Sequence, residues 1–410
     1  MTAPVFCERW GEICTPRLGV AQLTRLAYEG RNLRPLWHEL MEKATDDAAG
    51  AGMGMDLSVI AQLLGDKPTG LAIQNEVLAY QRFYRSPCSA PQPKLRLLAF
   101  AAALDIGGNT PLEFLLEGSE IELVTYYVIP GAPLPRRIPA HDVAFVAVPD
   151  DDATREILAS IEALLVSWPR PVLNHPTKIA GLDRDRLFRN LSGIEGLVIP
   201  PAARLTRKTA ERLAQDRALG HVLPGAQLPL IVRPVGSHAG RGLSKIDAWN
   251  DLAAYLRERT EGEFFLSPFV DYASADGMFR KYRLVFVDGK PYACHMAIAE
   301  VWKVWYLNAD MAHSAANRAQ EAAFMQDFEC GFAPRHAGAL DEMARRIGLD
   351  YFIVDCAETR DGQLLVFEAD NTAIVHDMDS PAVYPYKPAQ MRKIFQAMQA
   401  MLYRRSTGEA

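Results

Sequence analysis

Four side chains near the C-terminus have the types and spacing of a metal site. Asp355 ends one apolar run, and Glu368, Asp370 and Asn371 end the next, on the far side of an Asp-Gly pair. A hairpin across that turn would bring Asp355 and Glu368 together, and Glu368 and Asp370 would share one side of the strand. Clustered carboxylates repel unless a cation joins them, and hard oxygen ligands suit Mg²⁺ with bound phosphates. The pattern predicts a magnesium site, with a solvated acidic strand end as the alternative.

A glycine-rich segment between two stretches of strand character could bind phosphate. It follows Arg233 and contains Gly236, Ser237, His238, Gly240 and Gly242. A loop so poor in side chains lets backbone N–H groups approach phosphate oxygens, and Arg233 would add a fixed positive charge. The segment lacks the Gly-Lys-Ser/Thr ending of a Walker A loop and is not a Rossmann fingerprint. A purely structural glycine loop is the alternative.

These candidates belong to a chain with an ordinary soluble composition and room for two or three domains. It has 410 residues, a formal net charge of −6 and 49% hydrophobic residues. The acidic balance argues against nucleic acid or an anionic membrane as the main partner. Neither a signal peptide nor an apolar stretch long enough to span a membrane is evident. Six scattered Cys without a Cys-x-x-Cys pair predict a reducing cytoplasm as the compartment.

Residues 1–90 are predicted to form a helical N-terminal domain, bounded by a Pro-rich linker. Leucines recur at helical spacing in residues 23–40 and 57–64. Gly30 and Gly65 break two helix–turn–helix segments, at a separation close to the period of about 34 residues of tetratricopeptide repeats. Helical hairpins that bind a protein partner are one interpretation. A plain helical cap is the other.

Residues 91–175 are predicted to form a small parallel sheet with helices on its faces, because strand and helix patterns alternate. We expect strands at 95–103, 121–129, 143–148 and 171–173, and a helix at 151–168. Thr110, Pro111 and Glu113 predict a capping box at another helix start.

Residues 176–410 are predicted to form the domain that carries the chemistry, so the whole chain is of the α/β (α+β) class. Helices are expected at 183–191 and 248–259, and strands at 229–233 and 244–246 around the glycine-rich loop. Hairpins with Asp-Gly turns are expected at 283–296 and 351–368. The aromatic run 302–306, taken as a strand, would line a pocket or pack in a core.

The order of these motifs resembles the ATP-grasp superfamily, in the branch of glutathione synthetase, D-alanine:D-alanine ligase and ribosomal-protein glutamate ligases. Residues 174–176 with 185–187 are similar to its N-x-P … D-K-L entry to the ATP domain, and 230–242 to its V-x-K-P … G-S-x-G-x-G segment. Residues 264–270 lie where the family has its adenine-binding hinge. Residues 281–286 resemble its D-x-R strand, and Asp355 with 368–370 its D … E-x-N metal motif.

The resemblance implies an ATP-grasp fold after a small pre-ATP-grasp α/β domain, with ATP and Mg²⁺ as cofactors. It implies that Arg186 and Arg233, which replace two family lysines, hold the α- and β-phosphates. The remaining nucleotide-binding candidates are Gly236, Ser237, His238, Gly240, Gly242, Ser267, Phe269 and Val270. The metal ligands would be Asp355, Glu368, and Asp370 or Asn371. Arg283 would neutralise charge on the transferred group, and His295 and Lys303 are further catalytic candidates.

The implied activity is ATP-dependent carboxylate–amine ligation through an acyl phosphate, with small-molecule or peptide carboxylate and amine substrates. An ATP-grasp kinase is a second hypothesis, because the arginine that steadies the acyl phosphate has no clear match. A non-catalytic nucleotide sensor that binds a protein through the N-terminal helices is a third. A homodimer is a further expectation, since dimers are common in the family.

Overall fold

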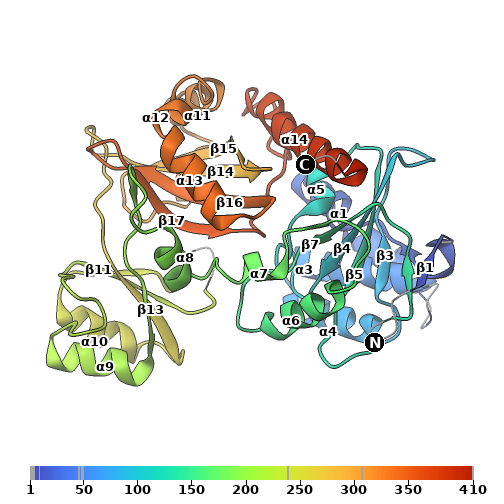
Figure 1. The fold of residues 1–410 in the computed structure, drawn as a ribbon, viewed down its shortest axis with the longest axis horizontal. Coiled ribbons are helices and arrows are strands. Elements are labelled where there is room, and N and C mark those ends of the chain that lie inside the picture. Colours follow the sequence, from blue (N-terminus) through green and yellow to red (C-terminus); the bar gives the residue numbers. More distant parts are fainter. Residues whose placement is uncertain are drawn as a thin grey trace. The chain divides into compact units, whose positions relative to one another are not determined.

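The structure is a computed structural model that describes residues 5–8, 10–44, 47, 50–133, 135–237, 240–305 and 308–408. The chain forms two compact units (Figure 1). Unit 1 comprises Met1–Ala180, Leu349–Phe352 and Asp370–Ala410, and unit 2 comprises Gly181–Gly348 and Ile353–Ala369. Both units mix helices with sheets, so the predicted α/β class is confirmed.

Unit 1 is built on a six-stranded sheet in the order β2-β3-β5-β4-β7-β8. Its strands are β2 Thr15–Pro16, β3 Phe83–Arg85, β4 Leu95–Ala101, β5 Ile121–Tyr127, β7 Val143–Val146 and β8 Val172–Leu173. β4 pairs in parallel with β5 and β7, and β7 with β8, so the predicted parallel sheet is confirmed. β3 adds an antiparallel strand next to β5. A separate parallel pair joins β1 Val5–Cys7 to β6 Arg137–Pro139.

Helices of unit 1 cover this sheet and one another. They are α1 Val20–Tyr28, α2 Arg34–Lys43, α3 Ala51–Leu63, α4 Lys67–Leu78, α5 Leu112–Leu115, α6 Arg155–Leu165, α7 Pro176–Ile179 and α14 Lys387–Thr407. α3 contacts α1, α2 and α4, and most of its residues are buried. α4 approaches α3 so closely that a Cβ on Gly70 would lie 2.6 Å from the carbonyl oxygen of Ser58. α3 is therefore a core helix of unit 1.

Two expectations for unit 1 need correction. Residues 1–90 are not purely helical: β1, β2 and β3 lie among the helices, and such short strands leave no periodicity to detect. The predicted capping box is wrong, because α5 begins after Pro111 without a side-chain cap. The Thr110 hydroxyl instead donates to the carbonyl of Asn371 at 2.8 Å. The Glu113 carboxylate instead accepts from the buried Arg17 at 2.6 Å, a tertiary ion pair that overrides local capping.

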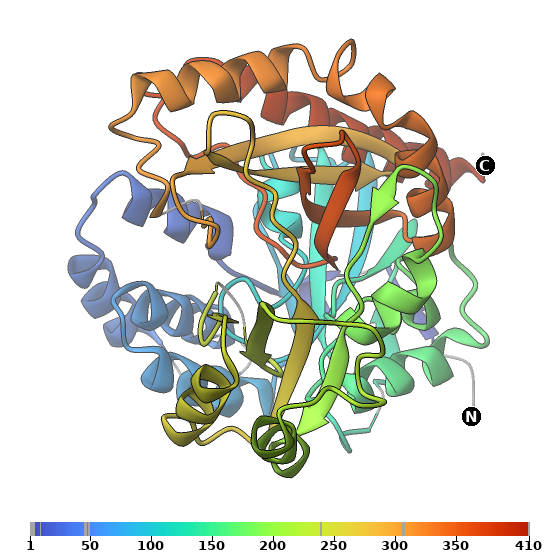
Figure 2. The same cartoon turned by 90° about the vertical axis from the view of Figure 1, so that its left-hand side faces the viewer.

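Unit 2 contains two sheets. The first has the order β10-β13-β11-β12, with β10 Ala203–Thr206, β11 Leu230–Pro234, β12 Ser244–Ile246 and β13 Glu263–Pro268. Every pairing in it is antiparallel. α9 Arg207–Asp216 and α10 Trp249–Arg257 pack side by side against it, around a core that includes Leu213, Leu252 and Phe264 (Figure 2).

The second sheet has the order β15-β14-β16-β17-β9. Its strands are β9 Leu197–Val198, β14 Phe279–Val287, β15 Lys290–Ala299, β16 Tyr351–Glu358 and β17 Leu364–Asp370. Both predicted Asp-Gly turns are present; in the first, Asp288 and Gly289 have φ of 51° and 76°, as a two-residue hairpin requires. The remaining helices are α8 Arg184–Leu191, α11 Ala315–Gln326, α12 Phe332–Arg335 and α13 Ala337–Ile347.

The two faces of this second sheet differ in character. On β14, Tyr282 points to the face covered by α12, where its ring lies 5.0 Å from that of Phe332. Lys281 and Arg283 flank Tyr282 and so point to the opposite face. The helices thus cover one face and leave charged side chains on the other. Among the described residues, no helix combines the length and apolar character needed to cross a membrane.

Candidate functional site

The first carboxylate of the site, Asp355, is held by two basic residues of the neighbouring strand. Its side chain, on β16, is only 1% exposed. Arg283 donates from Nε to Oδ1 at 2.8 Å and from Nη2 to Oδ2 at 3.1 Å. Lys281 Nζ lies 2.6 Å from Oδ2. Lys281 and Arg283 share a face because they are two residues apart on β14, so strand geometry alone directs both at Asp355.

The second carboxylate, Glu368 on β17, faces two arginines from other parts of unit 2. Arg184, at the start of α8, donates to its Oε2 and also to the carbonyl oxygen of Phe367 at 3.0 Å. Asp183 caps this helix by accepting from the backbone N–H of Arg184. Arg233, on β11, places Nη1 3.7 Å from the same Glu368 oxygen. One carboxylate therefore pairs with two guanidinium groups.

Electrostatics keep both carboxylates ionised. Burial by itself would raise the pKa of Asp355, but Arg283 and Lys281 outweigh it and hold this pKa well below its usual range. Burial would likewise raise the pKa of Glu368, and Arg184 and Lys281 lower it to about 2. Because Lys281 acts on both carboxylates, these side chains form one electrostatic unit.

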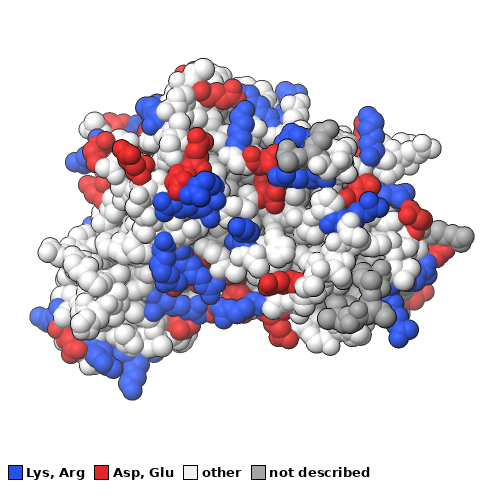
Figure 3. All heavy atoms as spheres, in the orientation of Figure 1, with Lys and Arg blue, Asp and Glu red and all other residues white. Residues whose placement is uncertain are grey.

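Positive charge exceeds negative charge in this group. We call the group the basic cluster: Arg184, Arg233, Lys281, Arg283, Asp355 and Glu368. It contains four basic and two acidic side chains. Burial, and then repulsion from Arg184, lower the pKa of Arg233 to about 10. Figure 3 shows Lys and Arg side chains gathered where Figure 1 places α8. An anion with several charges would relieve this excess.

The glycine-rich loop joins β11 to β12, as expected, and begins beside the basic cluster. Arg233 donates from Nε to the Ser237 hydroxyl at 3.2 Å, and that hydroxyl donates to the carbonyl of Pro234 at 2.7 Å. Gly236, Gly240 and Gly242 have φ of 70°, 67° and 68°, which side-chain-bearing residues rarely adopt. The predicted contact His238 lies outside the described residues.

The expected adenine-binding hinge, residues 264–270, comprises most of β13 and the two residues after it. Ser267 pairs with Ile231 of β11, and the backbone N–H of Phe269 donates to the carbonyl of Pro229 at 3.0 Å. Lys245 Nζ lies 4.6 Å from the centre of the Phe269 ring. Val270, which follows, is half-buried. These residues are thus close to one another and to the strand that carries Arg233.

The described part of the aromatic run, residues 302–305, is not a strand, so the expectation of a strand is wrong there. Residues 302–305 form bends and irregular backbone. Lys303 Nζ donates to the carbonyl of Leu243 at 3.0 Å, and Trp302 stacks edge-on against Phe269 at 5.7 Å. Long-range contacts with the glycine-rich loop and the hinge, rather than sheet pairing, hold this run. Tyr306 lies outside the described residues.

The remaining predicted residues lie in different settings. His295 is paired directly with Arg283 across β14 and β15, so both point to the face of the basic cluster. Arg186 lies on α8, two residues after Arg184, and contributes to the electrostatics of Asp183. Asp370 and Asn371 belong to unit 1.

Asp370 and Asn371 also make contacts within unit 1. Asp370 Oδ1 accepts from the backbone N–H of Thr372 at 2.7 Å. Asn371 Nδ2 donates to the carbonyl of Val148 at 2.9 Å. Their assignment as metal ligands stays a prediction.

The two carboxylates of unit 2 fit a magnesium ion by their chemistry. Over the residues that the structure describes, no three His, Cys, Asp or Glu side chains converge to hold a metal by themselves. Mg²⁺ does not require such a cage, since proteins bind it through one or two carboxylates with phosphates and water at the other positions. Asp355 and Glu368 are ionised hard oxygen donors on neighbouring strands.

Two members of the basic cluster were not among the predicted site residues. Arg184, rather than Arg186, contacts Glu368. Lys281 contacts Asp355 together with Arg283. The alternation of side chains along β14 could have identified Lys281, because it shares a face with Arg283. Nothing in the sequence distinguishes Arg184 from Arg186, since their roles depend on how α8 is oriented in unit 2.

Comparisons with known proteins gave weak likenesses. No protein-family model and no curated protein matches the sequence. Among solved structures, the chain is similar to a RimK domain protein ATP-grasp from Sphaerobacter thermophilus, with 15% identity, a TM-score of 0.45, and coverage of 75% of this chain and 99% of the other. It is also similar to the VanG D-Ala:D-Ser ligase from Enterococcus faecalis, with 12% identity, a TM-score of 0.46, and coverage of 76% and 100%. The third is a D-alanine–D-alanine ligase from Bacillus anthracis, with 14% identity, a TM-score of 0.44, and coverage of 77% and 99%. Likenesses at this level do not assign an activity, so the proposal below rests on the chain's own residues.

Proposed function

We propose that the chain is an ATP-dependent ligase of the ATP-grasp type, which joins a carboxylate to an amine through an acyl phosphate. The observation that carries the proposal is the excess of positive charge in the basic cluster. Four basic side chains surround two carboxylates on neighbouring strands. A nucleoside triphosphate supplies the missing negative charge, and a divalent cation matches the carboxylates.

The roles in nucleotide binding follow from position. Arg184 and Arg233 would bind phosphate oxygens, as both have N–H groups beyond those given to Glu368. The loop after Arg233 would bring its backbone N–H groups to the γ-phosphate, and its glycines allow this close approach. Phe269 would contact the adenine ring from the hinge. Arg186, further along α8, remains a second candidate for the phosphates.

In the transfer step, the substrate carboxylate would attack the γ-phosphorus and release ADP. The acyl phosphate formed would then react with an amine, which expels inorganic phosphate. Arg283 would stabilise charge on the transferred group through Nη1, which is not among the atoms that contact Asp355. His295, opposite Arg283, would take the proton that the amine loses. Lys303, bound to the loop carbonyl of Leu243, would keep the loop closed over the phosphates.

Asp355 and Glu368 would hold Mg²⁺. When bound, the ion withdraws charge from the phosphate oxygens and so makes phosphorus easier to attack. Lys281, now 2.6 Å from Asp355 Oδ2, would turn toward the phosphates, and the arginines would reach them through the N–H groups that the carboxylates do not use.

The experiment compares two arginines of the same helix. Nucleotide affinity is measured by calorimetry with Mg²⁺-ATP for wild type, Arg184→Met and Arg189→Met. Arg189 is exposed, and its side chain pairs with Asp185 one turn away, so its variant controls for loss of charge on α8. We expect Arg184→Met to bind about 10- to 100-fold more weakly, since charge-assisted hydrogen bonds contribute about 1.5–3 kcal/mol. Absence of ATP binding in wild type would refute the proposal.

Turnover is tested by a screen of carboxylic acids and amines for release of ADP. A ligase releases ADP and inorganic phosphate only when both substrates are present. A kinase releases ADP without inorganic phosphate and leaves a phosphorylated product. Detection of that product would replace ligation by phosphorylation and keep the nucleotide site.

A nucleotide sensor without turnover is a second candidate, favoured by the setting of Asp355. Both of its oxygens are engaged, by Arg283 and Lys281, in a side chain with almost no exposure. If these contacts persist with nucleotide bound, the cation site stays incomplete and ATP binds without reacting. Any substrate-dependent ADP release removes this candidate.

A further inference from the structure

One edge of the Arg233 guanidinium is bonded to the loop that follows β11. Its Nε donates to the Ser237 hydroxyl at 3.2 Å, and its Nη2 donates to the Ser237 carbonyl. Nε and Nη2 form the edge of a guanidinium group that binds two oxygens of a carboxylate or a phosphate side by side. Ser237 therefore presents two oxygens to the edge of Arg233 that a phosphate group would use.

The third nitrogen of Arg233 has a weaker partner. Nη1 lies 3.7 Å from Oε2 of Glu368, beyond the usual hydrogen-bond range, and Arg184 donates to the same oxygen. Within the part of the chain that the structure describes, Ser237 thus supplies the hydrogen-bond acceptors of a side chain that is only 12% exposed. Both acceptors are neutral, and neutral acceptors bind a guanidinium group about half as strongly as charged ones. A phosphate would be the stronger partner.

A tight turn holds Ser237 in this position without a ligand. The Ser237 hydroxyl donates its only hydrogen to the carbonyl of Pro234 at 2.7 Å, so its lone pairs are left for Arg233. The backbone N–H of Ser237 donates to the same carbonyl at 3.4 Å. Gly236 has a φ of 70°, which allows the chain to turn back within these four residues. The two oxygens are therefore fixed by residues 234–237 themselves.

The electrostatics of Arg233 agree with an incompletely satisfied cation. Burial, and then repulsion from Arg184, lower its pKa to about 10 even with Glu368 nearby. A buried cation without acceptors would be costly, so the bonds to Ser237 stabilise the empty site. They do so with oxygens that carry no charge, and Arg233 keeps its preference for an anion.

We propose that Ser237 is a placeholder for phosphate: its hydroxyl and carbonyl occupy Arg233 in the empty site, and a nucleotide phosphate displaces them when it binds. This inference rests on the proposed function and concerns the regulation of the same site. Displacement replaces two neutral acceptors by a charged one, which favours binding, but the bonds to Ser237 must first be broken. Ser237 therefore stabilises the empty site and lowers its affinity for nucleotide.

The alternative is that Ser237 binds phosphate directly, as expected from its place in the glycine-rich segment. The two assignments predict opposite effects when the hydroxyl is removed. A placeholder without its hydroxyl is displaced more easily, so ATP binds more tightly. A phosphate ligand without its hydroxyl loses a hydrogen bond to the nucleotide, so ATP binds more weakly.

The test measures the affinity for Mg²⁺-ATP by calorimetry in wild type, Ser237→Ala, Ser237→Thr and Ser244→Ala. We expect about 3- to 10-fold tighter binding in Ser237→Ala, the range that one hydrogen bond contributes, and wild-type affinity in Ser237→Thr, which keeps the hydroxyl. Ser244 is the control: it pairs with the buried Val232 and so lies on the opposite face of the sheet from Arg233. Ser244→Ala should bind ATP like wild type. Unchanged or weaker binding in Ser237→Ala would overturn the proposal.

A second measurement tests the contact without nucleotide. The bonds to Arg233 hold the turn at Ser237, so the backbone N–H of Ser237 should exchange with solvent at least about tenfold faster in Arg233→Met than in wild type or in the control Arg189→Met. Equal hydrogen-exchange rates in the three proteins would refute the contact. Absence of ATP binding in wild type would refute the proposed function and the displacement together. ATP that binds wild type, but binds Ser237→Ala no more tightly, would refute the placeholder alone.

Discussion

A buried arginine of unit 1, Arg17, has a carboxylate of its own, whereas two arginines of unit 2, Arg184 and Arg233, share one. Arg17 is paired with Glu113 at 2.6 Å. Glu113 also accepts from the Ser86 hydroxyl at 2.9 Å and from the backbone N–H of Ala21 at 3.1 Å. In unit 2, Arg184 and Arg233 share Glu368.

The pKa shifts of Arg17 and Arg233 differ in the same way, whereas Arg283 of unit 2, which is paired with Asp355, resembles Arg17. Burial alone would lower the pKa of Arg17, but Tyr127 and Glu113 raise it above its ordinary value. The pKa of Arg233 is lowered to about 10 by burial and by Arg184. A matched buried charge stabilises the fold, because its partner is lost on unfolding. A buried charge that lacks a carboxylate of its own is better satisfied by a bound ligand of opposite charge. Such a charge is therefore typical of a binding site.

Replacement of the matched arginine should have the largest effect on stability. Arg17→Met leaves Glu113 buried without its cation, and breaking a buried pair from one side costs about 3–5 kcal/mol. Chemical denaturation of wild type and variant measures the difference. The control is Arg25→Met, whose partly exposed pairs with Glu117 and Asp377 should contribute at most about 1 kcal/mol. Equal losses in the two variants would show that the buried pair of Arg17 contributes no more than the pairs of Arg25.

A second prediction concerns Asp56, a buried carboxyl of unit 1 to which no basic side chain of the described residues bonds directly. It accepts from the backbone N–H groups of Leu18 at 2.7 Å and Gly19 at 3.0 Å. Burial raises its pKa from 3.8 to about 6, despite these bonds. A raised carboxyl pKa favours folding at low pH, and this contribution is lost as the pH rises from about 4 to about 6. A shift of about two pKa units corresponds to about 3 kcal/mol.

The measurement compares the pH dependence of unfolding for wild type and Asp56→Asn. Burial lowers the pKa of His141 to about 4, so His141 adds stability as the pH rises through the same window. His141 is unchanged in the variant, so the difference between the two curves isolates Asp56. That difference should change by about 3 kcal/mol between pH 4 and 7. Parallel curves would show that burial does not perturb this carboxyl.

The third prediction applies the comparison to unit 2. Arg233→Met should weaken ATP binding about 10- to 100-fold while leaving the free energy of unfolding within about 1 kcal/mol of wild type. The reason is that Glu368 keeps Arg184, and the repulsion between the two guanidinium groups disappears. A loss of stability as large as that of Arg17→Met would show that Arg233 is structural.

Much of the fold could be predicted from the sequence, because the relevant signals were local. The predicted hairpins around Asp288-Gly289 and Asp361-Gly362 are confirmed, because an Asp-Gly pair between strand patterns supplies the positive φ of a tight turn. The parallel strands of unit 1 were recognisable as apolar runs. The short strands β1, β2 and β3 were missed, because two or three residues show no period.

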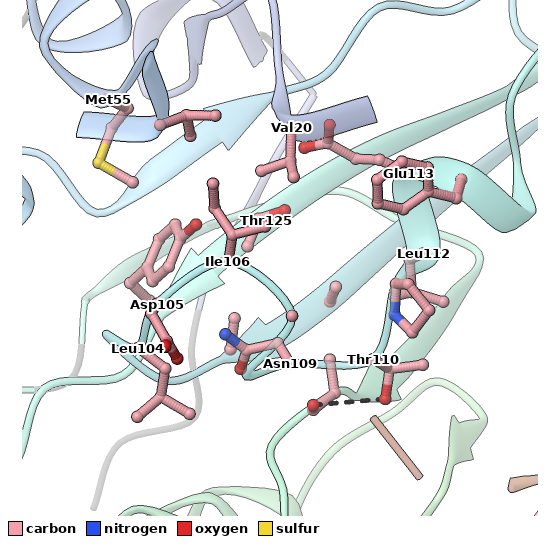
Figure 4. A pocket seen from close by; sticks show the side chains of 18 of the residues that line it. Val20, Met55, Leu104, Asp105, Ile106, Asn109, Thr110, Leu112, Glu113 and Thr125 are labelled. Carbon is pink, nitrogen blue, oxygen red and sulfur yellow. Dashed lines mark hydrogen bonds between the residues drawn. The ribbon is translucent and has the colours of Figure 1, made fainter. Parts of the chain in front are cut away.

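The candidate site was less predictable, because its contacts join distant segments. The sequence predicted that Asp355 and Glu368 lie on neighbouring strands. It did not predict that Arg184, rather than Arg186, contacts Glu368. It also suggested a capping role for Glu113, whose partner Arg17 lies 96 residues away. A pocket of unit 1 is lined by Arg17, Gln74 and Asp105, among others (Figure 4). Their spacing in the sequence does not predict that they lie near one another.

The smallest predicted effect concerns the loop beside the basic cluster. Gly242 and Gly225 both have positive φ, 68° and 76°. A Cβ on Gly242 would lie 2.7 Å from Cδ of Pro234, whereas a Cβ on Gly225 would meet nothing within 4 Å. Alanine at either position incurs the cost of a left-handed conformation, about 1–2 kcal/mol, and only Gly242→Ala adds the contact with the end of β11. We therefore expect Gly242→Ala to lose about 1 kcal/mol more stability than Gly225→Ala and to weaken ATP binding. Equal stability and equal ATP affinity in the two variants would show that the loop reaches the nucleotide without depending on its close approach to Pro234.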